Sequence, residues 1–195
     1  MISAVIEDAN GHTDAVINDG ELNVKAKDKA AIMQNAYVKN PELWDIDHPH
    51  LYYVTVYVKR GGELIDEVRE HFGFRTFRFD ADKGFFLNGR NIKIKGVCCH
   101  QDYGITGKAV ADNMCRYRIE LMKEMGANAY RTAHYPHSEA TMDALDELGL
   151  LAMDETRWFT SSEYGKKQLE MLIKRDRNRP SVILWPIGNM RNRLS

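Results

Sequence analysis

After residue 90 the chain alternates short apolar segments with amphipathic helices, and this alternation is the strongest constraint on its fold. Apolar side chains recur at helical spacing in residues 112–125, 138–148 and 163–175. Ser138 is placed as an N-cap, and Gly126 and Gly149 as helix ends. Short apolar segments flank these helices at residues 92–97, 127–131, 150–154 and 182–185. The pattern predicts a parallel sheet with right-handed crossovers.

The first part of the chain favours antiparallel strands instead. Residues 2–7, 21–27, 51–59 and 64–70 contain alternating, β-branched or aromatic side chains, which suit a pleated surface. Asp8-Ala9-Asn10-Gly11 contains the Asn-Gly hairpin signal, and Lys59-Arg60-Gly61-Gly62 provides a second turn. This part therefore predicts an antiparallel β-sandwich module, and the sequence changes character near residue 80.

Composition argues against several classes of partner. The chain has 27 Lys and Arg against 28 Asp and Glu, and no apolar run approaches the roughly 20 residues that span a bilayer. We therefore expect no nucleic-acid and no membrane partner. Basic residues cluster in 166–179, but neighbouring acidic residues favour a solvated helix face. Cys98 and Cys99 are adjacent and favour reduced thiols, and hence a reducing, cytoplasmic compartment.

Polar side chains directly follow each of the four predicted parallel strands. The carboxyl ends of such strands meet at one edge of the sheet, where function gathers. Imidazole, guanidinium, carboxylate, amide and aromatic groups would converge there, as in a site that binds sugar hydroxyls and C–H faces. The runs are Cys98-Cys99-His100-Gln101-Asp102, Arg131-Thr132-Ala133-His134-Tyr135-Pro136, Asp154-Glu155-Thr156-Arg157-Trp158 and Trp185-Pro186-Ile187-Gly188-Asn189.

Two of these runs sit inside longer motifs. Asn128-Ala129-Tyr130-Arg131-Thr132-Ala133-His134-Tyr135-Pro136, followed by Leu148-Gly149-Leu150 and Asp154-Glu155, is similar to the signature of family 2 glycoside hydrolases. Asp176-Arg177-Asn178-Arg179-Pro180-Ser181-Val182-Ile183-Leu184-Trp185 resembles a second family motif. Upstream, Phe72-Gly73-Phe74-Arg75 and Phe86-Leu87-Asn88-Gly89 resemble the join between the family's immunoglobulin-like domain and its barrel. The resemblance covers most of the chain.

The resemblance implies a multidomain α and β protein. Residues 1–78 would form a partial immunoglobulin-like β-sandwich, and residues 79–195 the first half of a TIM (β/α)8 barrel. The chain would then be an internal fragment that lacks its natural N-terminus. Family activity is hydrolysis of terminal β-glycosides with retention, as in β-galactosidases, without a cofactor. Some members bind Mg²⁺ after the third barrel strand, but residues 157–162 lack those ligands, so we expect no metal.

The resemblance also implies substrate-binding residues. His100 and His134 would contact sugar hydroxyls, Arg131 would position the carboxylates of the site, and Asn189 would hydrogen-bond the 2-hydroxyl. Asp102 or Glu155 would be the buried partner of Arg131. Ordinary salt bridges and strand caps are the structural alternatives for these residues, and Trp158 and Trp185 are either sugar platforms or barrel packing. The predicted set is His100, Asp102, Arg131, His134, Glu155 and Asn189.

One departure from the family affects catalysis. The family has Gly-Asn-Glu after the fourth strand, with that Glu as general acid/base, whereas this chain has Gly188-Asn189-Met190. Methionine carries no titratable proton, and retaining glycosidases need two carboxylates. The second, nucleophilic Glu of the family would lie beyond Ser195. We therefore expect no intact catalytic residue and no turnover, and the alternative function is a non-catalytic carbohydrate-binding or vestigial protein.

Other interpretations of these residues stay open. His100, His134 and His137 offer three imidazoles for a metal, although they lack tight ligand spacing. Cys98 and His100 share a strand face and are a possible nucleophile and base. A half barrel would also leave an open parallel edge, which predicts self-association of the chain.

Overall fold

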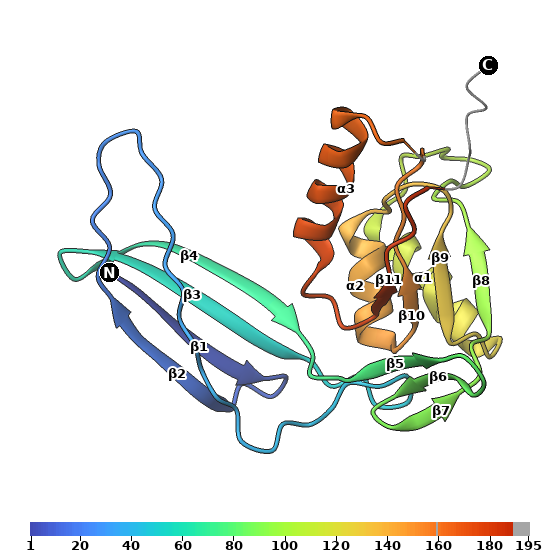
Figure 1. Cartoon of the computed structure of the whole chain (residues 1–195), viewed down its shortest axis with the longest axis horizontal. Helices are drawn as coiled ribbons and strands as arrows, with labels where there is room; N and C mark the ends of the chain where they lie inside the picture. Colours follow the sequence, from blue (N-terminus) through green and yellow to red (C-terminus); the bar gives the residue numbers. More distant parts are fainter. Residues whose placement is uncertain (159, 189–195) are drawn as a thin grey trace. The chain divides into compact units, whose positions relative to one another are not determined.

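A computed structural model describes residues 1–158 and 160–188, and the chain forms two compact units. One unit contains Met1–Glu42 and His50–Phe74, and the other contains Leu43–Pro49 and the chain from Arg75 onward. Each unit has its own β-sheet (Figure 1). Each also has its own cluster of buried apolar side chains.

The first unit contains one antiparallel sheet. Its strands are β1 (Ile2–Asp8), β2 (Thr13–Gly20), β3 (Tyr52–Arg60) and β4 (Glu63–Phe72), in the order β2-β1-β3-β4. The predicted hairpin turn is present: the Asp8 carboxylate accepts hydrogen bonds from the backbone N–H groups of Asn10 and His12, both at 2.8 Å. Ile6, Val38 and Tyr52 form the buried cluster, against which Phe72 and Phe74 pack.

The strand expected at residues 21–27 is wrong. The partner of β1 is Thr13–Gly20, which follows the turn directly, and residues 21–27 contain no strand. The entropic cost of closing a hairpin is smaller for a short turn than for a long one. Pairing of β1 with the adjacent segment Thr13–Gly20 is therefore favoured over pairing with residues 21–27. The side chains of residues 21–27 are mostly exposed, so their alternation has no buried face to match.

The second unit begins with a small antiparallel sheet that the sequence analysis did not predict. It contains β5 (Phe77–Asp80), β6 (Gly84–Leu87) and β7 (Arg90–Ile92), in the order β5-β6-β7. The strand expected at 92–97 is therefore misplaced. Ile92 ends β7, and the parallel strand β8 is Gly96–Cys99. Strands of three or four residues are too short to show a clear alternation of apolar and polar side chains. Pairing with neighbouring strands determines where they form, and a local sequence pattern does not reveal it.

The predicted parallel sheet is confirmed. Its strands β8, β9 (Ala129–Thr132), β10 (Leu151–Met153) and β11 (Val182–Leu184) lie side by side in chain order. Helices α1 (Asp112–Glu124), α2 (Glu139–Leu148) and α3 (Glu163–Asp176) connect them. Ser138 caps α2 by accepting the N–H of Thr141, and Gly149 ends it with a φ of 71°. No helix of the described ranges is both long and apolar enough to cross a membrane.

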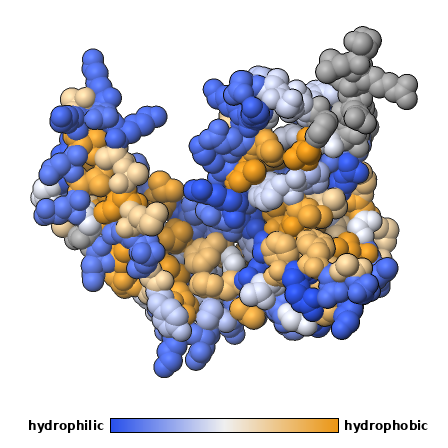
Figure 2. Space-filling view, viewed as in Figure 1, coloured by the Kyte–Doolittle hydropathy of each residue, from blue (hydrophilic) through white to orange (hydrophobic). Residues whose placement is uncertain are grey.

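The two faces of this sheet differ. Tyr130, Ala152 and Val182 join the buried cluster formed with the helices, which also contains Ile119, Met142 and Leu145. The opposite face carries Gly96, Cys98, Ala129, Arg131 and Met153 around a pocket of about 240 Å³. Figure 2 shows hydrophobic side chains gathered over the strands of this sheet. A second apolar surface is a stripe on α1, formed by Met114, Tyr117, Leu121 and Met125, each at least 40% exposed.

A single arginine joins α2, α3 and the loop before β11. Arg179 donates hydrogen bonds to Asp143 at 2.6 Å and Asp146 at 3.0 Å through Nη1, and to Asp176 at 2.8 Å through Nε. The side chains of Asp146 and Asp176 are fully buried, so Arg179 compensates charge that water cannot reach. Asp146 also accepts the N–H of Ser181 at 3.0 Å. This network fixes the spacing of both helices from the sheet.

Replacement of Arg179 tests the importance of that network. Arg179→Met keeps the aliphatic stem but removes the guanidinium that bonds both Asp146 and Asp176, while Arg175 still bonds Asp176. Breaking a buried ion pair in this way costs about 3–5 kcal/mol. We expect the free energy of unfolding, measured by urea denaturation, to fall by an amount in that range. Arg177→Met, on the exposed end of α3, is the control and should change stability by under about 0.5 kcal/mol. Equal effects of the two substitutions would contradict this account.

Candidate functional site

Three of the predicted site residues meet at the carboxyl ends of β9 and β10. The Glu155 carboxylate accepts two hydrogen bonds on Oε2, from Arg131 Nε at 3.1 Å and Arg131 Nη2 at 2.8 Å. Its other oxygen, Oε1, lies 2.8 Å from Nδ1 of His134. An ionised carboxylate only accepts hydrogen bonds, so Nδ1 of His134 carries the proton. We call these three residues the Glu155 cluster.

Burial gives the Glu155 cluster its electrostatic character. The side chain of Glu155 is fully buried, whereas the Arg131 side chain is 32% exposed and that of His134 is 23% exposed. Hydrogen bonds to Glu155 raise the pKa of Arg131, so the guanidinium stays charged. The carboxylate therefore holds a guanidinium and an imidazole that are both partly exposed. Because Nδ1 carries the His134 proton, Nε2 of the neutral ring is an acceptor, whereas the Arg131 guanidinium is a donor. This arrangement suits the binding of hydroxyl groups better than transfer of a proton by Glu155, because the Glu155 side chain is fully buried.

Thr132 positions the backbone of Glu155. The Thr132 hydroxyl oxygen accepts the backbone N–H of Glu155 at 3.0 Å. The same hydroxyl donates to either the backbone carbonyl of Met153 at 3.3 Å or Oδ1 of Asp154 at 3.2 Å. Thr132 is itself fully buried, and it links the end of β9 to the end of β10. The contact fixes the direction in which the Glu155 side chain leaves the strand.

Behind the Glu155 cluster lies a buried pair of acids. Burial, and next the neighbouring Asp176 carboxylate, raises the pKa of Asp154 to about 8. The pKa of Asp176 is lowered instead. Burial alone would raise this pKa, but hydrogen bonds from Arg175, Asp154 and Arg179 outweigh burial and lower it. Asp154 therefore holds the proton and Asp176 the negative charge. The pair connects the site to the Arg179 network, because Asp176 belongs to both.

His100 stands beside the Glu155 cluster rather than within it. Its ring lies edge-on to that of His134 at 5.2 Å and is 5.8 Å from Tyr135, measured between ring centroids. Tyr135 is fixed in turn, because its hydroxyl accepts the backbone N–H of Gln101 at 3.1 Å. The Gln101 side chain accepts the N–H of Ser138 at 2.6 Å, which ties the loop after β8 to the start of α2.

Of the two carboxylates expected as possible partners of Arg131, the partner is Glu155. Asp102 is exposed, and its backbone carbonyl accepts a hydrogen bond from Arg118 Nη2 at 2.7 Å. Among the described residues, no hydrogen bond joins the Asp102 carboxylate to the Glu155 cluster. Asn189, predicted to contact the sugar, lies outside the described residues, as does Met190.

Sequence reasoning missed several supporting residues. Thr132 and Tyr135 lie within a polar run identified after a predicted strand, but their partners were not predicted. Arg118 on α1 holds the loop after β8 through the carbonyls of His100 and Asp102, at 2.6 and 2.7 Å. No sequence signal identifies a residue of this kind. Its partners are backbone carbonyls, which every residue type has, so the contact leaves no pattern in the sequence.

The three imidazoles do not form a metal site. His137 is 1% exposed, and its Nδ1 lies 3.1 Å from the Tyr130 hydroxyl. Burial lowers the pKa of His137 to about 4, so it is neutral at physiological pH. Within the described ranges, the one group of His, Cys, Asp and Glu side chains close enough to share an ion is Asp8, His12 and Asp14, on the first unit.

Comparisons with known proteins identify relatives for both units. Residues 2–75 match "Glycosyl hydrolases family 2", and residues 80–168 match "Glycosyl hydrolases family 2, TIM barrel domain". The β-galactosidase BoGH2A of Bacteroides ovatus is 38% identical over 96% of this chain, and a β-glucuronidase of Bacteroides fragilis is 34% identical over 89%. The chain spans only 23% and 28% of the length of these two relatives.

Solved structures give the same result. A family 2 glycosyl hydrolase from Bacteroides cellulosilyticus superposes on 96% of this chain with a TM-score of 0.84 and 38% identity. A β-glucuronidase from Bacteroides uniformis superposes on 94% with a TM-score of 0.85 and 35% identity. This chain covers 26% and 23% of those two chains. The similarity therefore extends over both units but over about a quarter of each relative.

The buried acid pair predicts a pH dependence of stability. The folded chain favours the protonated form of Asp154. The contribution of Asp154 to the free energy of unfolding is therefore fully present below the ordinary pKa of 3.8, and it is lost as the pH rises through about 8. Asp154→Asn mimics the protonated form. We expect its stability relative to the unaltered chain to grow with pH between about 4 and 8, by up to about 1.4 kcal/mol per pH unit. Urea denaturation across this range measures the difference.

Asp82→Asn is the control, because Asp82 is an exposed aspartate in the turn between β5 and β6. It should show no such trend. A stability difference for Asp154→Asn that stays constant with pH would show that Asp154 ionises normally in the folded chain.

Proposed function

The chain belongs to glycoside hydrolase family 2, and from that premise we propose that it binds the terminal sugar of a β-glycoside at the Glu155 cluster without hydrolysing it. The single observation that carries the proposal is the fully buried Glu155 carboxylate, which holds the partly exposed side chains of Arg131 and His134 at the carboxyl ends of β9 and β10. Relatives over most of this chain are named β-galactosidase and β-glucuronidase. The proposed ligand is accordingly a galactoside or a glucuronide.

The geometry supports binding through one donor and one acceptor. A sugar hydroxyl can both accept and donate a hydrogen bond, so it can accept from the Arg131 guanidinium or donate to Nε2 of His134, whose proton on Nδ1 faces Glu155. Pre-organisation of this kind reduces the entropy lost on binding, because Glu155 already orders both side chains in the free protein. His100 and Tyr135 extend the site with ring faces and edges, against which the C–H surface of a sugar can pack.

The absence of turnover follows from residue chemistry. Retaining hydrolysis needs a general acid and a nucleophilic carboxylate about 5–5.5 Å apart. The family motif places the acid at position 190, which is methionine here and has no proton to give. In this proposal Glu155 does not replace it, because its side chain is fully buried and held by Arg131 and His134. The proposal for this chain is therefore a carbohydrate-binding protein with the scaffold of a hydrolase.

A second part of the proposal concerns association between copies of the chain. The stripe of Met114, Tyr117, Leu121 and Met125 on α1 presents contiguous apolar side chains to solvent. Such a surface is stabilised when a second apolar surface covers it. We expect sedimentation analysis to show self-association that increases with concentration and that Leu121→Glu weakens. A monomer at every concentration tested would contradict this part of the proposal and leave the binding site unaffected.

Loss of one imidazole tests the binding site. His134→Ala removes the imidazole and its Nε2 acceptor, while Glu155 keeps its hydrogen bonds to Arg131. We expect the affinity for p-nitrophenyl β-galactoside or β-glucuronide, measured by calorimetry, to fall about tenfold, because one hydrogen bond to the sugar is lost. His12→Ala is the matched control: the His12 side chain is 75% exposed and lies in the first unit. Equal affinities for all three proteins would refute the assignment.

A further inference from the structure

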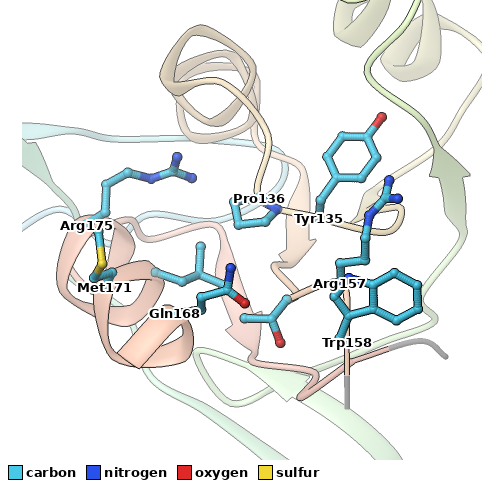
Figure 3. Close-up of a pocket in the computed structure, with 9 residues that line it drawn as sticks. Tyr135, Pro136, Arg157, Trp158, Gln168, Met171 and Arg175 are labelled. Carbon is cyan, nitrogen blue, oxygen red and sulfur yellow. The ribbon is translucent and has the colours of Figure 1, made fainter. Parts of the chain in front are cut away.

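A larger pocket lies beside the Glu155 cluster. It has a volume of about 620 Å³ and lies between α3 and the connections that follow β9 and β10 (Figure 3). Thr156 lines it and directly follows Glu155, while Tyr135 lines it and directly follows His134. The pocket therefore begins one residue from the Glu155 cluster on each of the two connections.

The charges around this pocket are unbalanced. The Arg157 guanidinium lies 4.9 Å from the centre of the Tyr135 ring, and Lys108 Nζ lies 5.1 Å from the same ring. Arg175, also in the wall, donates two hydrogen bonds to Asp176, which compensates its charge. Within residues 1–158 and 160–188, no carboxylate pairs with Arg157. The pocket thus offers a positive guanidinium, oriented on an aromatic ring, for which the described chain supplies no anion.

The remaining wall includes two large, accessible side chains. Trp158 is 41% exposed and Met171 is 63% exposed, and both line the pocket (Figure 3). An indole face suits the C–H surface of a sugar ring. A neutral sugar would use the Trp158 face but leave the guanidinium without a partner. A carboxylate or sulfate would pair with it through two parallel N–H···O hydrogen bonds, a geometry that arginine provides and lysine does not.

We propose that this pocket is an accessory subsite for an anionic group, a carboxylate or a sulfate ester, carried by a glycan. Arg157 binds the anion, Lys108 adds positive potential across the Tyr135 ring, and Trp158 supports the sugar that carries the charge. The proposal rests on the proposed function for its choice of a glycan, since the pocket shares its two connections with the Glu155 cluster. The anionic specificity comes from the pocket itself.

The test is calorimetric titration of the full chain with three β-linked disaccharides that share one terminal sugar. One carries a uronate, one a sulfate ester, and one is neutral. We expect the anionic ligands to bind about tenfold more tightly than the neutral one, which is the contribution of one charge-assisted pair. Arg157→Gln should remove that difference and leave affinity for the neutral ligand unchanged. Arg157→Lys keeps the positive charge but cannot donate two parallel hydrogen bonds. It should therefore retain only part of the preference for the anionic ligands.

Lys167→Gln is the matched control, because Lys167 is exposed on α3 and is not among the pocket residues. It should bind all three ligands as the unaltered chain does. The preference should also weaken as salt rises, since exposed charges are screened. Far-UV circular dichroism of each variant confirms its fold. The uronate and sulfate arms report separately which anion the pocket prefers.

The outcomes separate this proposal from the proposed function. If His134→Ala weakens every ligand and Arg157→Gln weakens none, the accessory subsite is overturned and the glycoside site stands. If Arg157→Gln weakens only the anionic ligands while His134→Ala has no effect, the subsite stands and the Glu155 assignment falls. Equal binding of neutral and anionic ligands, or no binding of any, overturns the subsite.

Discussion

The second unit depends on the compensation of buried negative charge by Arg179. Asp146 and Asp176 lie on different helices and have fully buried side chains, and the same guanidinium bonds both. A buried carboxylate without a partner is strongly destabilising. Arg179 therefore favours the packing of the two helices that brings both acids to it, and Arg175 adds a second guanidinium to Asp176. Ser181 adds its N–H to Asp146 and so places the start of β11 in the same frame.

This charge network extends to the site. Asp176 is shared between Arg179 and Asp154, Asp154 contacts the Thr132 hydroxyl, and Thr132 holds the backbone of Glu155. The direction of the Glu155 side chain is therefore set by contacts that reach back to the packing of α3. Arg131 and His134 then follow from Glu155, since its two oxygens determine where their donors lie.

How far the sequence predicts this structure depends on the range of each interaction. Ser138 and Gly149 mark helix ends through local backbone geometry, so α2 is predicted almost to the residue. The missing strand at 21–27 and the unpredicted strands β5 to β7 depend on pairing partners that no local pattern reveals. For the site, the strand-end rule brings Arg131, His134 and Glu155 together. The buried pair of Asp154 and Asp176 is not predictable from the sequence. Its two members are far apart along the chain, and the sequence does not show that they are buried while other aspartates are exposed.

The central claim is that the chain keeps a sugar-binding scaffold while position 190 lacks the catalytic acid. Hydrolysis of a panel of p-nitrophenyl β-glycosides by the purified chain, beside its Glu155→Gln variant, tests this most directly. The account predicts no release of p-nitrophenol by the chain, because the methionine at position 190 has no proton to give to the glycosidic oxygen. Release by the unaltered chain that Glu155→Gln abolishes would contradict it, since Glu155 would then be a catalytic carboxylate and not an anchor.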